Sequence, residues 1–241
     1  MRFGGNLKTG LRGGSVGLRR FGILLAFLVT SPSIVWAQMA PRPNVEMRGV
    51  AGSLGGGYTD FYVISPAQNF KLDRGVFLAG AGERGFNFLN LYLTFTLSMM
   101  IAEGVTNYDY TTLNNQNYTA TDVQFRSNML EANLGLKFKL IDNYWVRPYA
   151  EAGGIGGYHE VSYTNKQAEL SAQGSDFKRK DAIMGGGHYK EFGIEVDFSE
   201  AFGIKVAARF SEFETKKLET LANQPIRFKA ETYYLSALRS F

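Results

Sequence analysis

The sequence contains few side chains that could act as nucleophiles, general bases or metal ligands. It has no cysteine, which excludes disulfides, thiolate metal sites, a lipid-modified cysteine and cysteine nucleophiles. Its two histidines are His159 and His188. Ser162 follows His159 by three positions, so in an extended strand the two side chains point to opposite faces. We therefore expect ordinary histidines near the rim of the fold and no enzyme. A Ser/His/acid site assembled across strands is the alternative.

A glycine-rich segment, Gly80–Gly85, matches the pattern G-x-G-x-x-G. In a dinucleotide-binding protein this pattern opens a helix whose N-terminus holds the pyrophosphate. The next segment, Leu91–Ser98, alternates apolar and polar residues with a period of two, which indicates a strand. We therefore expect a turn at the glycines and no cofactor.

Alternation with a period of two is the main structural pattern of the chain. In the segment 130–140, leucine, alanine and phenylalanine occupy every even position, while Glu131, Lys137 and Lys139 lie among the odd ones. Segments 91–98, 191–198 and 202–211 show the same pattern. One face is almost purely apolar and the other is ionic. The alternation is also compatible with a soluble sandwich, so it does not identify the fold by itself.

The connections between these segments alternate in length. Short turns are expected at 83–87, Asp142-Asn143 and 199–201, and longer loops at 113–117, 165–180 and 223–225. This predicts about eight strands, at 48–64, 74–82, 89–111, 118–140, 144–164, 181–198, 202–221 and 226–241. Short turns at one end and long loops at the other are typical of antiparallel barrels in bacterial outer membranes, with the short turns in the periplasm.

Aromatic residues separate into two groups along the predicted strands. One group lies beside the short turns and comprises Phe138, Tyr144, Trp145, Phe198, Phe202 and Phe241. The other lies toward the long loops and comprises Tyr108, Tyr110, Tyr118, Tyr158, Tyr163 and Phe213. Aromatic side chains prefer the two headgroup layers of a membrane, which produces such girdles. The distribution favours an all-β, transmembrane, antiparallel up-and-down barrel over a soluble sandwich.

The N-terminal segment has the pattern of a secretory signal peptide. Five basic residues precede the apolar run 21–29, and Val35 and Ala37 place small or modest side chains where a signal peptidase needs them. We predict a cleaved signal peptide at 1–37, a short periplasmic segment at 38–47 and the barrel at 48–241. Removing 5 of the 26 basic and none of the 22 acidic residues leaves 21 against 22. The near-neutral remainder gives no support for nucleic-acid binding.

The chain resembles the small outer-membrane barrels of the OmpA and OmpX type over residues 38–241. The resemblance lies in architecture and in the C-terminal strand, with Tyr233, Leu235 and a terminal Phe241. It implies that these three residues form the signal bound by the barrel-assembly machinery. Arg239 departs from the pattern, since an apolar residue is usual there. Some barrels of this size deacylate lipid A with a serine two positions after a histidine, but here Val161 occupies that position.

The ionic faces of the strands predict the contents of the barrel. An eight-stranded barrel has an interior just wide enough for side chains to fill, and opposite charges there should pair. We expect a plugged lumen with an ion-pair network and no open pore. Glu191 belongs to the ionic face as well. The network residues are Glu131, Lys137, Lys139, Arg147, Glu151, Glu195, Asp197, Lys205, Arg209 and Glu231.

The remaining expectations concern function. The first hypothesis is a structural or surface-interaction protein of the outer membrane, acting through its external loops. Lys178, Arg179 and Lys180 could contact lipopolysaccharide phosphates, although a solvated loop end explains them too. The alternatives are a small passive channel, including a conduit for hydrophobic solutes of the OmpW type, and a lipid A-modifying enzyme. The expected partners are outer-membrane lipid, lipopolysaccharide and the assembly machinery, and a monomer is expected.

Overall fold

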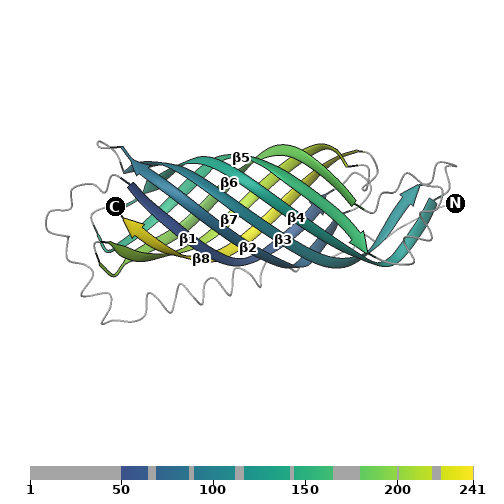
Figure 1. The fold of residues 1–241 in the computed structure, drawn as a ribbon, viewed down its shortest axis with the longest axis horizontal. Coiled ribbons are helices and arrows are strands. Elements are labelled where there is room, and N and C mark those ends of the chain that lie inside the picture. Colours follow the sequence, from purple (N-terminus) through teal and green to yellow (C-terminus); the bar gives the residue numbers. More distant parts are fainter. Residues whose placement is uncertain are drawn as a thin grey trace, which may run out of the picture. The chain divides into compact units, whose positions relative to one another are not determined.

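The computed structural model describes residues 50–64, 69–86, 90–111, 117–141, 144–164, 180–199, 201–218 and 224–240 (Figure 1). The predicted signal peptide and periplasmic segment, 1–47, lie outside these ranges, as do Lys178, Arg179 and Phe241. Within the described ranges, no helix is long and apolar enough to cross a membrane.

Eight antiparallel strands form one closed barrel in which each strand pairs with the next, and the last pairs with the first (Figure 1). The strands are β1 (Val50–Ile64), β2 (Asn69–Gly85), β3 (Leu91–Thr111), β4 (Asn117–Lys139), β5 (Val146–Thr164), β6 (Lys180–Asp197), β7 (Phe202–Leu218) and β8 (Gln224–Ser240). Closure leaves no unpaired sheet edge, which a strand structure needs in order to cross a bilayer. The predicted up-and-down barrel of eight strands is confirmed.

The second strand differs from the prediction. The sequence predicted a short strand at 74–82 and a turn around 83–87, with Gly80–Gly85 in a turn. In the structure Glu83 pairs with Ala51 of β1 and with Thr94 of β3, so β2 continues to Gly85. The turn prediction was wrong because glycines interrupt the hydrophobic alternation without interrupting the backbone pairing. Hydrogen bonds to two neighbouring strands hold this segment extended.

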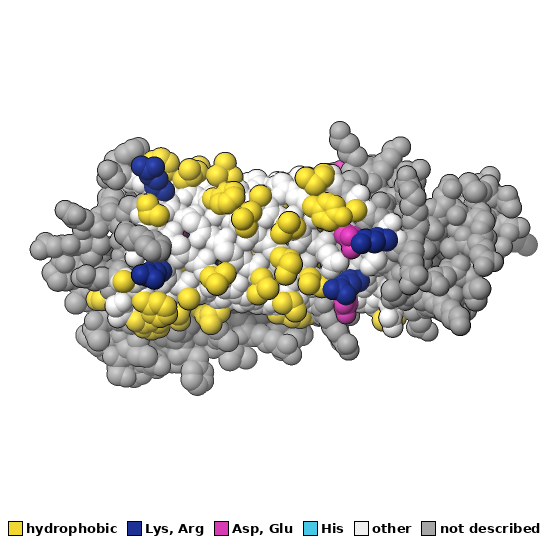
Figure 2. Space-filling model, viewed as in Figure 1, with side chains coloured by type: hydrophobic (Ala, Val, Ile, Leu, Met, Phe, Trp, Pro, Cys, Tyr) yellow, Lys and Arg dark blue, Asp and Glu magenta, His cyan; other side chains and the backbone are white. Residues whose placement is uncertain are grey.

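The two faces of the barrel wall differ in polarity. On β4, Leu130, Leu134 and Leu136 point outward and are 53–58% exposed, while Glu131 and Lys137 between them are almost completely buried. Figure 2 shows hydrophobic side chains across the middle of the wall and charged ones toward its two ends. An exposed apolar belt around a polar interior is the arrangement of a transmembrane barrel, since lipid then covers the apolar face.

The end of the barrel with short turns carries outward aromatic side chains. Phe138, Phe198 and Phe202 are each about half exposed there. The β6–β7 turn is closed by backbone hydrogen bonds from Phe198 and Ser199 to the Phe202 carbonyl, at 2.9 and 3.1 Å. These residues form the predicted girdle at this end. Of the predicted girdle at the long-loop end, Tyr158 is exposed, but Phe213 is buried in the lumen, so its assignment was wrong.

One hairpin extends beyond the rest of the wall at the long-loop end (Figure 1). Strand β3 pairs with β2 only up to Glu103, and β4 pairs with β5 only from Gln124 onward. Beyond these points β3 and β4 continue to pair with each other, up to the pair Thr111 and Asn117. The hairpin therefore forms a two-stranded ribbon past the closed part of the barrel.

Candidate functional site

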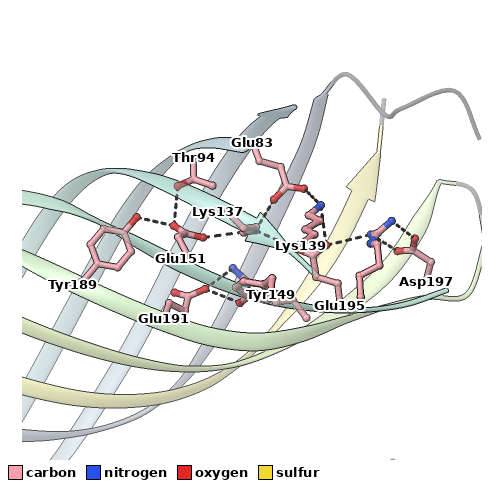
Figure 3. Close-up of polar contacts among 12 residues, drawn as sticks. Glu83, Thr94, Lys137, Lys139, Tyr149, Glu151, Tyr189, Glu191, Glu195 and Asp197 are labelled. Carbon is pink, nitrogen blue, oxygen red and sulfur yellow. Dashed lines mark hydrogen bonds and ion pairs between the residues drawn. The ribbon is translucent and has the colours of Figure 1, made fainter. Parts of the chain in front are cut away.

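An ion-pair network joins side chains in the half of the lumen next to the short turns (Figure 3). At its centre, the Lys137 Nζ lies 2.5 Å from Glu83 Oε2, 3.0 Å from Glu195 Oε1 and 3.7 Å from Glu151 Oε2. Lys137 belongs to β4, whereas its three partners come from β2, β6 and β5. Lys137 therefore links β2 to β6, which lie on opposite sides of the barrel, as well as binding the adjacent β5.

The network continues toward the short turns through Lys139 and Arg147. Lys139 Nζ lies 2.6 Å from Glu83 Oε1 and 3.0 Å from Glu195 Oε2. Arg147 lies 3.2 Å from Glu195 and contacts Asp197 through both terminal nitrogens, at 2.8 and 3.1 Å. This bidentate geometry is the strongest form of an arginine–carboxylate contact, because it makes two parallel charge-assisted hydrogen bonds.

A second group of charges lies deeper in the lumen, around Glu191. Its carboxylate accepts a hydrogen bond of 2.7 Å from the Tyr149 hydroxyl. Lys205 and Arg209 lie 3.5 and 4.0 Å from the same carboxylate. Arg209 also lies 3.7 Å from Glu131. These longer distances make the second group looser than the one around Lys137.

Hydroxyl groups and rings complete the polar lining. Tyr189 and Thr94 donate hydrogen bonds of 2.6 and 2.8 Å to the same Glu151 oxygen. Gly135 makes room for this arrangement, since a Cβ at that position would lie 2.1 Å from the Tyr189 hydroxyl. The Arg209 guanidinium stacks 4.0 Å from the Tyr189 ring centroid, a cation–π contact that offsets part of its desolvation.

The described lumen contains one more carboxylate than it contains cations. The carboxylates are Glu83, Glu131, Glu151, Glu191, Glu195 and Asp197, and the cations are Lys137, Lys139, Arg147, Lys205 and Arg209. Glu131 is the least well paired, because its Oε1 has no hydrogen-bond partner among the described residues. Its other oxygen accepts a hydrogen bond of 2.9 Å from Ser98.

The half of the lumen toward the long loops is apolar and aromatic. The rings of Phe61 and Phe228 stack at 5.6 Å, and His159 packs edge-on against Phe228 at 4.0 Å. Phe125 and Phe213 are buried in the same cluster. The prediction that His159 is a rim residue was wrong, because its side chain points inward and is completely buried. His188 points outward and is exposed.

Sequence reasoning missed the partner of His159, which lies on the neighbouring strand. Ser127 Oγ lies 2.5 Å from His159 Nε2, and both residues are buried. This is the geometry of a nucleophile and its base. However, the His159 Nδ1 has no partner among the described residues, so no acid orients the imidazole there. The pair therefore lacks the third member of a hydrolytic triad and lies closed off from solvent.

The structure brings together all the predicted network residues except Glu231. On β8 the buried positions are the even ones from Ile226 to Leu238, so Glu231 points outward, where it is partly exposed. The prediction failed because both faces of β8 carry polar and aromatic residues, which hides the phase of the alternation. Conversely, Glu83 was missed, although the inward series Phe77, Ala79, Ala81 and Glu83 could have revealed it.

A band of ion pairs encircles the outer wall near the long-loop end. These pairs are Lys71–Asp60 at 3.1 Å, Arg126–Glu103 at 3.6 Å, Lys180–Glu160 at 2.7 Å, Arg227–Glu212 at 3.0 Å and Lys229–Glu212 at 3.3 Å. Lys180, one of the three predicted lipopolysaccharide contacts, thus begins β6 within this band.

Of the predicted assembly signal, Tyr233 and Leu235 point outward from β8, and Leu235 is 53% exposed.

No protein-family model matches the sequence, and no curated protein matches it. Solved structures of outer-membrane barrels are similar in fold. Neisserial surface protein A is 14% identical, with 80% of this chain and 97% of that chain covered and a TM-score of 0.46. Ail, the attachment invasion locus protein of Yersinia pestis, in complex with the heparin analogue sucrose octasulfate, is 11% identical (79% and 99% covered, TM-score 0.43). The outer membrane protease OmpT of Escherichia coli is 6% identical (83% and 99% covered, TM-score 0.49).

Proposed function

We propose that this chain is a non-conducting outer-membrane barrel that serves a structural or surface-interaction role on the outside of the cell. The side-chain contacts that cross the lumen in both of its halves support the proposal. In the half next to the short turns, Lys137 and its carboxylates bridge the interior from strand to strand. In the half toward the long loops, the packed rings of Phe61, Phe228 and His159 close the interior. Since the inside is occupied, interactions with the surroundings fall to the outer wall and the external end.

The external end offers two features for such a role. The β3–β4 ribbon extends past the closed wall and presents a two-stranded surface outside the membrane. The band of ion pairs offers cations such as Lys180, Arg227 and Lys229, which are 44–62% exposed and can bind lipopolysaccharide phosphates through charge-assisted hydrogen bonds. Residues 1–37 direct export, and residues 233–241 direct assembly, in this proposal.

Planar-bilayer recording tests the closed lumen. The purified protein is expected to give no conductance steps, because both halves are filled. A Phe61→Gly/Phe228→Gly/Lys137→Gly variant, which shortens side chains in both halves, is expected to conduct. Steps from the unmodified protein that match those of this variant would replace the proposal with a passive channel.

A second candidate function is a conduit for hydrophobic solutes. It is favoured by the apolar half of the lumen toward the long loops. An apolar naphthylamine dye, followed by fluorescence in lipid vesicles, separates the two functions. If the lumen is closed, the dye should show no more saturable binding to the unmodified protein than to a Phe125→Trp variant. The larger ring of that variant leaves less room in the apolar half. Saturable binding that the larger ring removes would identify the apolar half as a ligand site.

We also propose that the chain is not an enzyme, although Ser127 and His159 lie in contact. The two side chains are buried among phenylalanine rings, where no polar substrate reaches them. The test is the lipid A mass spectrum of cells that express the protein, with His159→Ala and His188→Ala as variants. Identical spectra are expected. A lipid A species that disappears only with His159→Ala would establish enzymatic activity.

A further inference from the structure

The apolar belt of the outer wall contains a charged side chain, Lys190. It points outward from β6, between the exposed rings of Phe192 along the strand and Phe210 across it. Along β6 it lies between Lys180 in the ion-pair band and Phe198 in the lower girdle, which places it deep in the belt. An ionisable side chain facing lipid at this depth is unfavourable, and such residues usually have a functional partner.

Lys190 has no ion-pair partner among the described residues of its own chain. The outward carboxylate two positions beyond Phe210 is Glu212, which is already bound by Arg227 and Lys229 at 3.0 and 3.3 Å. The described residues of this chain therefore leave no carboxylate for Lys190, and a carboxylate from a neighbouring molecule in the membrane would supply the missing partner.

A complementary charge lies two strands away, on the outward face of β8. Glu231 is only partly exposed and pairs across the sheet with Asp60 of β1. Lys71 acts on both carboxylates, but its ion pair of 3.1 Å is with Asp60. Among the described side chains around Glu231, two carboxylates thus share one lysine, which leaves one negative charge more than there are cations.

The two unmatched charges lie at similar depths in the membrane. Lys190 pairs across the sheet with Phe210, and Phe210 pairs with Glu231, so the three residues share one row. Two strand spacings at the usual tilt of a barrel correspond to a rise of about 6 Å along the axis. The long stem of a lysine covers such an offset.

The surfaces around the two charges differ in relief. Beside Lys190, the outward residues of β5 are Ala152, Gly154 and Gly156, and a Cβ on Gly156 would meet nothing within 4 Å. The packing of the chain therefore does not require glycine at this position. Without a side chain there, the outer surface of the wall has a shallow depression. Beside Glu231, the rings of Tyr58 and Tyr233 project outward, with Tyr58 46% exposed.

We propose that copies of this chain associate laterally in the membrane, with the tyrosine ridge of one copy (Tyr58, Glu231, Tyr233) seated in the glycine hollow of the next (Ala152, Gly154, Gly156, Lys190). Glu231 of one copy then neutralises Lys190 of its neighbour. Small residues allow a close approach of the two walls, and tyrosine is common at protein interfaces. A symmetric contact of two hollows is disfavoured, because it would bring two lysines together.

Because the contact joins two different surfaces, each copy keeps one free ridge or hollow after pairing. Heterologous contacts of this kind build closed rings or open rows rather than isolated dimers. The assembly differs in this respect from the monomer expected from the sequence.

Disulfide trapping tests the contact directly, because the chain has no cysteine of its own. A Gly156→Cys/Tyr58→Cys variant has its thiols on β5 and β1, which are too far apart around the barrel for a bond within one copy. Mild oxidation in dilute lipid vesicles is expected to give dimers and larger species. The control, Gly156→Cys/Leu97→Cys, places the second thiol on the leucine-rich β3 wall and is expected to stay monomeric. The proposal would be overturned if the test variant stayed monomeric, or if the test and control variants gave equal amounts of disulfide-linked species.

A charge exchange in the same cysteine background tests the role of Lys190. Lys190→Glu and Glu231→Lys are each expected to reduce the disulfide-linked species about tenfold, because each places like charges in contact. The double exchange restores the opposite pairing and is expected to restore the ladder. Heat-modifiable migration on gels verifies that each variant forms a barrel. The assigned ion pair would be refuted if the single variants left the amount of disulfide-linked species unchanged, or if the double exchange did not restore it.

Discussion

The two halves of the lumen are held together by different kinds of side-chain contact. The half near the short turns is held by ion pairs that cross the interior, such as Lys137 with Glu195 at 3.0 Å. The half near the long loops is held by packed rings, such as Phe61 on Phe228 at 5.6 Å. An ion-pair network loses much of its stability when one charge is removed, because the partners stay buried and uncompensated. An apolar cluster loses stability in proportion to the volume removed.

The largest expected effect comes from Lys137→Met, which deletes the central cation and keeps most of the side-chain volume. Three carboxylates then lose a cation, and the free energy of unfolding should fall by about 3–5 kcal/mol. Urea-induced unfolding in lipid vesicles, followed by tryptophan fluorescence, measures it. A loss below 1 kcal/mol would mean that the two halves respond alike, which contradicts the comparison.

An intermediate effect is expected from Phe228→Leu in the aromatic half. The smaller side chain loses contacts with Phe61 and His159, and the same unfolding measurement should show a loss of about 1–2 kcal/mol. Phe228→Ala, which leaves a larger cavity, should cost more than Phe228→Leu. Equal losses from the two variants would show that cavity volume does not control this half.

A smaller effect is expected from the double variant Ser127→Ala/His159→Phe. It removes a buried polar pair whose His159 Nδ1 has no described partner, and replaces it by apolar groups of similar size. Stability should therefore stay within about 1 kcal/mol of the unmodified protein, since both members of the hydrogen bond are removed together. The single variant His159→Phe, which leaves the Ser127 hydroxyl alone, should be less stable than the double. The reverse order would show that the pair is not an isolated polar unit.

The smallest effect is expected from Glu212→Gln on the outer wall. Glu212 is paired with Arg227 and Lys229, but these cations are 50% and 44% exposed. Exposed ion pairs contribute about 0–1 kcal/mol and are weakened by salt. The difference from the unmodified protein should shrink as salt rises in the unfolding assay. A salt-independent loss as large as that of Lys137→Met would place Glu212 in a buried network instead.

The predictability of the lumen from sequence also differs between strands. In the segment 130–139 of β4 the outward residues are leucine, alanine and phenylalanine and the inward ones include Glu131, Lys137 and Lys139, so the phase of the alternation fixes the orientation of these side chains. On β8 aromatic and polar residues occur on both faces, and Glu231 was assigned to the wrong one. The two faces can be distinguished only when their compositions differ.

The aromatic half of the lumen was not predictable from the same pattern. Phe213 was expected in a girdle because an aromatic residue near the end of a strand is normally assigned to the membrane interface, and His159 was expected at the rim because it lies near the outer end of its strand. Both point inward, where rings fill the interior. Their contacts come from strands distant in the chain, such as Phe61 of β1 with Phe228 of β8, and a single sequence does not show which distant residues meet.

The crossing ion pairs also have a consequence for the order of assembly. Lys137 on β4 takes its partners from β2, β5 and β6, so a hairpin or a half-built sheet would carry naked charges into the hydrocarbon. These charges are satisfied only when the sheet has nearly closed. Insertion of single hairpins is therefore unfavourable, whereas a nearly closed sheet enters the bilayer with these charges paired. Once closed, the same network resists reopening, which gives the folded barrel a long kinetic lifetime.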